Sequence, residues 1–135
     1  MRIEEHEEAY KEHLNHLKLD IEKGVKENQR NIGYNASQGS VELFSIFLHK
    51  LNLIGISGEM FDHRIFKTKK LVDKRISSNF PNKTKILEIM RKIEENRNIL
   101  CYGKRKPPEE IKKVIILFNN LRKIINKELK DGRKK

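Results

Sequence analysis

Cysteine is almost absent from this sequence of 135 residues. The single thiol, Cys101, excludes an intramolecular disulfide and indicates a reducing compartment, so we expect a cytoplasmic protein. A chain of this length can still bury a core without disulfides or a structural metal. It fits a single domain, which we place at residues 1–129, followed by a basic tail at residues 130–135 that we expect to fray.

Long apolar runs are also missing. The longest mainly apolar stretch, residues 41–56, is interrupted by Glu42, His49 and Lys50 and is not a membrane span. Residues 1–8 are acidic and contain no apolar segment, so we expect no signal peptide. Apolar and polar residues nowhere alternate cleanly, which argues against strands. We therefore expect a helical protein that does not associate with membranes.

Negative charge is in the minority, because 30 Lys and Arg residues outnumber 19 Asp and Glu residues, which gives a formal net charge of +11. A field of this sign attracts polyanions and acidic partners but carries no information about the fold. The composition offers a second explanation for the positive charge, since alanine occurs only at positions 9 and 36 while Ile, Lys and Asn are abundant. Such a bias is typical of an AT-rich genome and raises the lysine content without any ligand.

The spacing of the apolar residues predicts five helices packed as an all-α, up-and-down bundle. We place them at about residues 3–29, 35–53, 62–76, 84–103 and 107–129. Apolar residues cover most of the circumference of the second segment, which is typical of a central, buried helix. Its small residues Ala36, Gly39 and Ser40 would let another helix approach closely. The predicted turns contain glycine, proline or asparagine and lie at residues 55–58, 77–82 and 103–106.

Arg97 interrupts the apolar stripe of the fourth segment, four residues after Ile93 and three before Leu100. A guanidinium keeps its proton and is costly to bury without partners. One interpretation is that its stem packs while its head reaches water, with Glu94 one turn earlier as an ion-pair partner. The other is that Arg97 faces a polar cleft or a dimer interface and binds an anion.

The histidines and the cysteine indicate little chemistry. His6, His13 and His16 lie on the first segment, and His13 and His16 share a face of it, but no third ligand follows at convincing spacing, so we expect three solvated side chains and no metal. His49 is expected to be a hydrogen-bonded core residue, and His63 an exposed one. Cys101 lies at the apolar edge of its helix and is interpreted as a buried structural thiol.

A basic turn follows Gly103. Lys104, Arg105 and Lys106 suit contacts to phosphate groups, although a merely solvated turn would have the same sequence. Tyr102 lies at the edge of this turn, where its ring could stack on a base or its hydroxyl could form a hydrogen bond.

Residues 34–105 resemble the HEPN superfamily of small helical proteins. Residues 34–43 (YNASQGSVEL) are similar to the family's second helix, which opens with small residues and a Gln and then becomes apolar. Residues 61–64 (FDHR), together with Leu71, resemble the polar entry to its third helix. Residues 97–103 (RNILCYG) resemble the signature near the end of its fourth helix.

This resemblance implies which residues carry the function. The family's catalytic signature is an Arg, often followed by Asn, Asp or His, then three further residues and a His. Arg97 and Asn98 match, whereas Tyr102 occupies the position of the His. Active members are metal-independent ribonucleases, in which the Arg and His of two subunits face each other. Others are non-catalytic partners of minimal nucleotidyltransferases, and in some of those a Tyr accepts a nucleotide.

Because tyrosine has an unperturbed pKa of about 10 and is a poor base, a binding protein is favoured over an enzyme. We predict a dimeric, HEPN-like module that binds nucleic acid or nucleotides around Arg97, Asn98 and Tyr102, needs no cofactor and has a minimal nucleotidyltransferase as its partner. The residues expected to bind phosphates are Lys104, Arg105, Lys106 and Arg64. One alternative is a toxin-type, metal-independent endoribonuclease with an altered motif. A second is a helical scaffold or interaction protein.

Overall fold

The computed structural model describes residues 2–54 and 61–133, with side chains as far as Asp131. The described residues form five α-helices and one 3-10 helix, η1, and contain no strand. Their bounds are α1 Ile3–Lys23, α2 Gln29–Lys50, η1 His63–Lys67, α3 Lys69–Arg75, α4 Lys83–Cys101 and α5 Pro108–Arg133. The prediction of an all-α bundle is confirmed.

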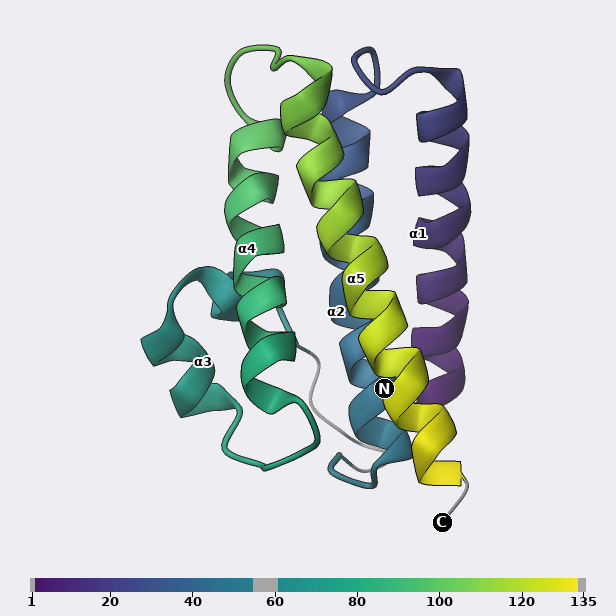
Figure 1. The fold of residues 1–135 in the computed structure, drawn as a ribbon, viewed down its shortest axis with the longest axis vertical. Coiled ribbons are helices and arrows are strands. Elements are labelled where there is room, and N and C mark those ends of the chain that lie inside the picture. Colours follow the sequence, from purple (N-terminus) through teal and green to yellow (C-terminus); the bar gives the residue numbers. More distant parts are fainter. Residues whose placement is uncertain (1, 55–60, 134–135) are drawn as a thin grey trace.

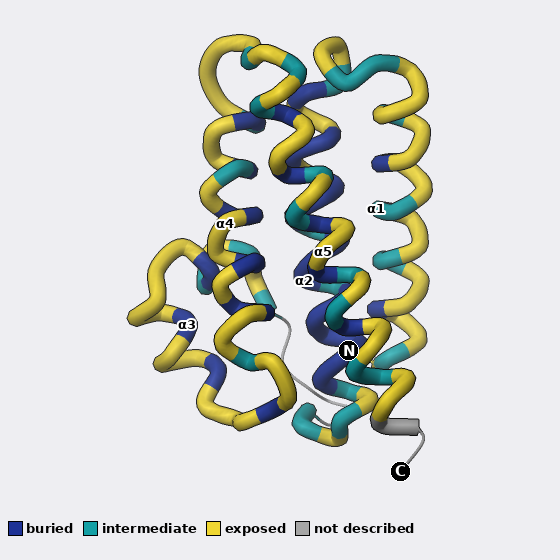
Figure 2. The backbone as a smooth tube through the Cα atoms, in the orientation of Figure 1, coloured by how far each residue is buried: buried dark blue, intermediate teal, exposed yellow. Residues whose placement is uncertain are grey.

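The four long helices of the described chain run alternately up and down (Figure 1). α1 rises, α2 descends beside it, α4 rises on the other side, and α5 descends across the front. α2 contacts α1, α4 and α5, so it is the central helix, as predicted. Buried positions accordingly extend along α2 and along the inward stripes of α4 and α5 (Figure 2).

α3 and η1 lie outside this four-helix core. α3 packs mainly on η1, and η1 in turn contacts α4 and α2. Aromatic rings make this attachment, because the ring of Phe44 on α2 lies 5.9 Å from that of Phe66 and 5.8 Å from that of Phe80. The predicted third helix is thus wrong in detail. It is interrupted at Thr68, whose backbone is extended and whose hydroxyl caps α3 by accepting from Leu71 N.

The boundary between the first two helices also differs from the prediction. α1 ends at Lys23 because Gly24 has a φ of +143°, which breaks the helix. α2 begins at Gln29, well before Asn35, where we expected it. Among the residues that its first turns bury, Gln29 is polar and Gly33 is small, and Ile32 alone is large and apolar, so the hydrophobic spacing did not reveal this start.

Smaller differences concern the ends of the other helices. α4 ends at Cys101, and α5 continues through Arg133, past Leu129, where we expected the tail to begin. The turn predicted at residues 55–58 lies outside the described residues.

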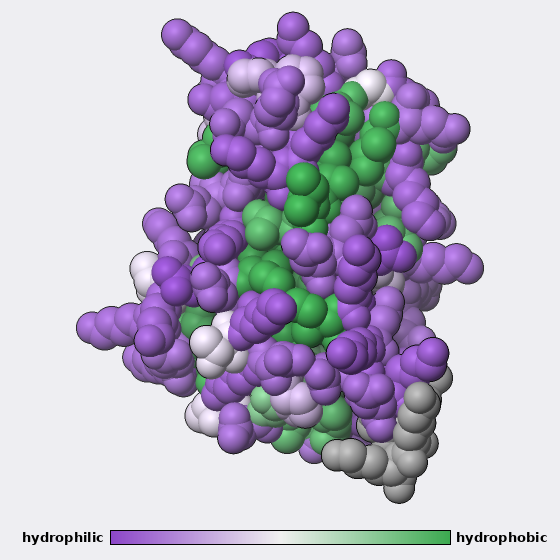
Figure 3. Space-filling model, in the orientation of Figure 1, coloured by the Kyte–Doolittle hydropathy of each residue, from purple (hydrophilic) through white to green (hydrophobic). Residues whose placement is uncertain are grey.

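The outer surface of the bundle is mostly hydrophilic, with apolar side chains visible along α5 and the seams beside it (Figure 3). No helix in residues 2–54 and 61–133 is long and apolar enough to cross a membrane.

α2 and α4 pack closely against each other at Gly33. A Cβ atom at this position would lie 2.9 Å from Leu100 Cβ and 3.4 Å from Cys101 Sγ. Leu100 is fully buried, and its Cβ is fixed by the helix backbone, so this neighbour cannot move aside easily.

We therefore expect Gly33→Ala to destabilise the fold. The free energy of unfolding should fall by about 1 kcal/mol, because overpacking costs about 2 kcal/mol in the middle of its usual range and the gain in helix propensity returns about 1 kcal/mol. Urea denaturation measures the change. A variant as stable as the parent would show that the two helices do not meet at this glycine.

Candidate nucleic-acid interface

Arg97 points from α4 toward α2. Its Nη1 donates to Ser37 Oγ at 3.2 Å, and its guanidinium carbon lies 5.3 Å from the centre of the Tyr34 ring. The side chain is 9% exposed, and its buried Nε has no hydrogen-bond partner among the described residues. Arg97 is thus a buried cation with one unused donor, covered by an aromatic ring.

Tyr34 is held between this cation and a histidine of α1. The ring of His13 meets the Tyr34 ring edge-on, with centroids 5.8 Å apart, and His13 Nδ1 lies 3.0 Å from Asn35 Oδ1. Asn35 Nδ2 donates to Asn31 O at 2.9 Å, which orients the amide so that its oxygen accepts from His13. Tyr34 is nevertheless 42% exposed, so one aromatic ring is presented to solvent in a fixed position.

Two expectations about the neighbouring charges are wrong. Glu94 does not pair with Arg97, because both of its carboxylate oxygens lie 2.8 Å from His63 Nδ1. His63 is therefore a partner of a carboxylate that is itself 4% exposed, and not a freely solvated side chain. The two buried charges of α4 have separate partners, with Glu94 directed to η1 and Arg97 to α2.

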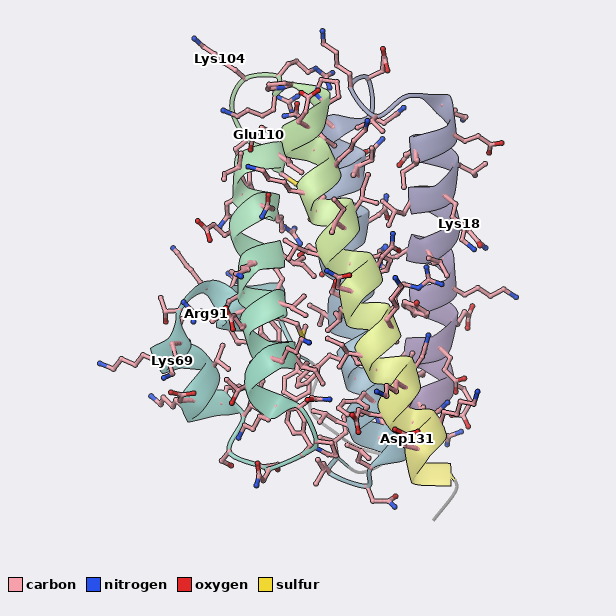
Figure 4. All side chains as sticks on the ribbon, viewed as in Figure 1. Lys18, Lys69, Arg91, Lys104, Glu110 and Asp131 are labelled. Atoms are coloured by element: carbon pink, nitrogen blue, oxygen red, sulfur yellow. The ribbon has the colours of Figure 1, made fainter. Side chains whose placement is uncertain are left out.

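The basic turn after α4 is fixed to the start of α2 by a buried amide. Gln29 Nε2 donates to Leu100 O at 3.1 Å and to Lys104 O at 3.2 Å, while Gln29 Oε1 accepts from Lys106 N at 2.7 Å. Lys104 itself is exposed and extends away from the end of the bundle (Figure 4). The turn therefore presents its cations from a rigid base.

Arg30 connects this turn to Tyr34. Its Nη2 donates to Gly103 O at 2.9 Å, and it precedes Tyr34 by one helical turn on α2. Cys101 lies beside it, with Sγ 3.6 Å from Arg30 O. Burial raises the pKa of the Cys101 thiol, against the opposing effect of Arg97 and Arg30, so the thiol is a packed group and not an activated nucleophile.

The structure separates the residues that the motif places together. Tyr102 is 68% exposed and shares no hydrogen bond or ring contact with Arg97 in the described structure. Asn98 also diverges from Arg97, because neighbouring helical residues point about 100° apart. It lines a groove between α3 and α4. Arg97 instead meets the Tyr34 ring, which in turn contacts His13, and the sequence assigned neither residue to this site.

Arg64, expected to bind phosphate, already has an anionic partner. Its Nη2 and Nε reach Asp62 Oδ2 and Oδ1 at 2.8 and 3.0 Å. Side-chain and backbone hydrogen bonds from Arg64 lower the pKa of Asp62 to about 2. Arg64 therefore offers less free charge than the exposed Lys104.

Histidine burial differs from the expectation. His6 is 2% exposed, and its Nδ1 lies 2.6 Å from Glu42 Oε2, so the prediction of a solvated side chain is wrong here as it is for His13. His16 is exposed as expected. Within the described ranges, no group of three or more His, Cys, Asp and Glu side chains is arranged to hold a metal ion.

Comparison with protein-family models, with curated proteins and with solved structures finds no match. The resemblance to the HEPN superfamily therefore stays a prediction based on the residues quoted above. The function is argued below from the side chains and their contacts.

Replacing Arg64 should change the titration of Asp62. In Arg64→Ala the pKa of Asp62 should rise from about 2 toward 3.8, remaining below it because the backbone N–H at position 64 still donates. The lowered pKa of Asp62 stabilises the fold at pH values above the ordinary pKa of the carboxyl group. This stabilisation is lost as the pH falls toward the lowered pKa. NMR titration of the Asp62 carboxyl tests this, and an unchanged pKa would contradict the contact.

Removing His63 should leave Glu94 buried without its partner. We expect His63→Ala to lower the free energy of unfolding by about 1–3 kcal/mol, and His63→Ala/Glu94→Gln to recover part of the loss because no charge is then stranded. His16→Ala is the control, since that side chain is exposed. Urea denaturation compares the variants. Equal stability of His63→Ala and His16→Ala would argue against the pair.

Proposed function

We propose that this protein binds single-stranded RNA without cleaving it, on the surface that runs from Tyr34 across Arg30 to the basic turn at residues 104–106. The observation that carries the proposal is the half-exposed Tyr34 ring, which is held by Arg97 and His13 and lies one helical turn from Arg30, the residue that binds the basic turn.

The Tyr34 ring suits an unpaired base. Proteins that bind single strands present aromatic rings on which bases stack, and such stacking tolerates any base. Arg97 beneath the ring and His13 at its edge restrict its rotation, so little conformational entropy remains to be lost on binding.

The basic turn suits the backbone of the strand. Lys104 and Arg105 are exposed, and the turn that carries them is anchored through Gln29. The formal net charge of +11 extends this attraction over the molecule. Contacts of this kind favour RNA without regard to sequence.

Binding is favoured over catalysis because Tyr102 takes the place of the family's His and shares no contact with Arg97. His13 is the imidazole closest to this surface, so RNA cleavage that disappears in His13→Ala would favour the endoribonuclease alternative instead. The homodimer, the nucleotidyltransferase partner and the cytoplasmic location remain predictions. Arg97 has its contacts within one chain, so a second subunit is not needed to accommodate its charge.

A labelled RNA of about a dozen nucleotides tests the proposal by fluorescence anisotropy. Affinity should fall about tenfold or more between about 50 and 200 mM salt. Tyr34→Leu should weaken binding about tenfold because the stacking ring is lost, whereas Tyr34→Phe keeps the ring and should bind like the parent.

Arg97→Met tests whether RNA binding depends on the buried Arg97 side chain itself or only on the overall positive charge. It keeps the length of the side chain and should fold normally, because removing a buried charge also removes its desolvation cost. Its affinity for RNA should fall more than that of Lys127→Met, which removes one exposed charge from α5. Equal losses in the two variants, or unchanged binding by Tyr34→Leu, would refute the proposed surface.

A further inference from the structure

We propose that the groove between α3 and α4 is a second binding site, which takes a small phosphate ester of the size of a sugar phosphate or a mononucleotide. This proposal is independent of the RNA surface. The groove exists because α3 packs on η1 and leaves a space beside α4. Its volume is about 620 Å³, within the usual range for small-molecule sites.

Cations line both walls of this groove. They are Lys67 at the end of η1, Lys69 on α3, and Lys83, Arg91 and Lys92 on α4. Figure 4 labels one from each wall, Lys69 on α3 and Arg91 on α4. Because the cations come from three elements that form the two walls, a phosphate in the groove could be approached from both sides. Charge-assisted hydrogen bonds of this kind are the strong ones.

Some carboxylates in the groove already have partners. Glu88 lies 3.4 Å from Lys92, and the buried Glu94 accepts from His63. The lining as a whole holds five cations and four carboxylates, the last being Asp73, Glu88, Glu94 and Glu95. Positive charge is therefore in excess where the ligand would lie.

His63 has a specific part in this balance. Glu94 forms part of the groove wall and is 4% exposed, so its charge would otherwise repel a phosphate at short range. The hydrogen bond to His63 Nδ1 satisfies the carboxylate from the side of η1. The same pair that attaches η1 to α4 thus directs this carboxylate toward η1.

The remaining polar groups favour an ester over inorganic phosphate. Asp73 and Glu95 accept hydrogen bonds, and Thr84 and Asn98 can both donate and accept. Such groups suit the hydroxyls of a sugar or the amino group of a base. Thr84 lies in the first turn of α4, which contains no acidic residue and has no side-chain cap, so the helix terminus adds to the attraction for an anion.

Isothermal titration calorimetry with AMP, ribose 5-phosphate and adenosine tests this site. We expect saturable binding of at least one phosphate ester with a Kd of about 1 mM or tighter, and none of adenosine. If ribose 5-phosphate binds as tightly as AMP, the groove is a sugar-phosphate site. If AMP binds more tightly, it is a nucleotide site. Either result supports the proposal.

Lys69→Gln/Arg91→Gln should weaken this binding about tenfold or more. The matched control Lys18→Gln/Lys127→Gln removes the same charge at exposed positions outside the groove and should change it less than about twofold. All four side chains are exposed, and thermal melts confirm that both variants fold. Arg97→Met should bind the ester normally, which separates this site from the RNA surface.

Three results would overturn the proposal. One is the absence of saturable binding by both phosphate esters. A second is binding of adenosine as tight as that of AMP. The third is an equal loss of affinity in the groove variant and the matched control, which would show that the net charge alone attracts the ligand.

Discussion

The close approach of α2 and α4 at Gly33 is the constraint on which the other features depend. It brings Leu100 against the α2 backbone and places Arg97, one turn earlier on α4, within reach of Ser37. It also brings the end of α4 to the start of α2, where Gln29 holds the basic turn. A wider spacing would separate the ring, the guanidinium and the turn, and the exposed surface would lose its fixed geometry.

The way α4 accommodates two buried charges follows from this packing. Glu94 and Arg97 are close enough in sequence to form a pair, which would be the simplest means of burying both. They instead find partners on different elements, because η1 packs on one side of α4 and α2 on the other. Each charge consequently ties α4 to a different part of the molecule, which helps to fix how these elements are placed.

Helix-period spacing was enough to predict the all-α bundle and its central helix, and the break in that spacing at Arg97 identified a buried polar residue. The start of α2 was not predictable in this way, because Gln29 and Gly33 are buried for their hydrogen bonds and small size, and not for hydrophobicity. Tyr34 and His13 were also missed. They meet only because α1 and α2 pack in one particular register, although the position of Tyr34 one turn before Ser37 was a signal that could have been used.

The attachment of α3 has a consequence for local stability. A helix of seven residues has too few hydrogen bonds to persist alone, and α3 is held by η1 and by the buried side chains of Phe66, Val72 and Ile76. These side chains join the same buried core as the four long helices, but α3 itself packs mainly on η1. We therefore expect α3 to be the helix that opens at the lowest free energy. Its amide hydrogens should exchange through openings that leave the four long helices folded, so that one wall of the groove detaches while the surface around Tyr34 keeps its shape.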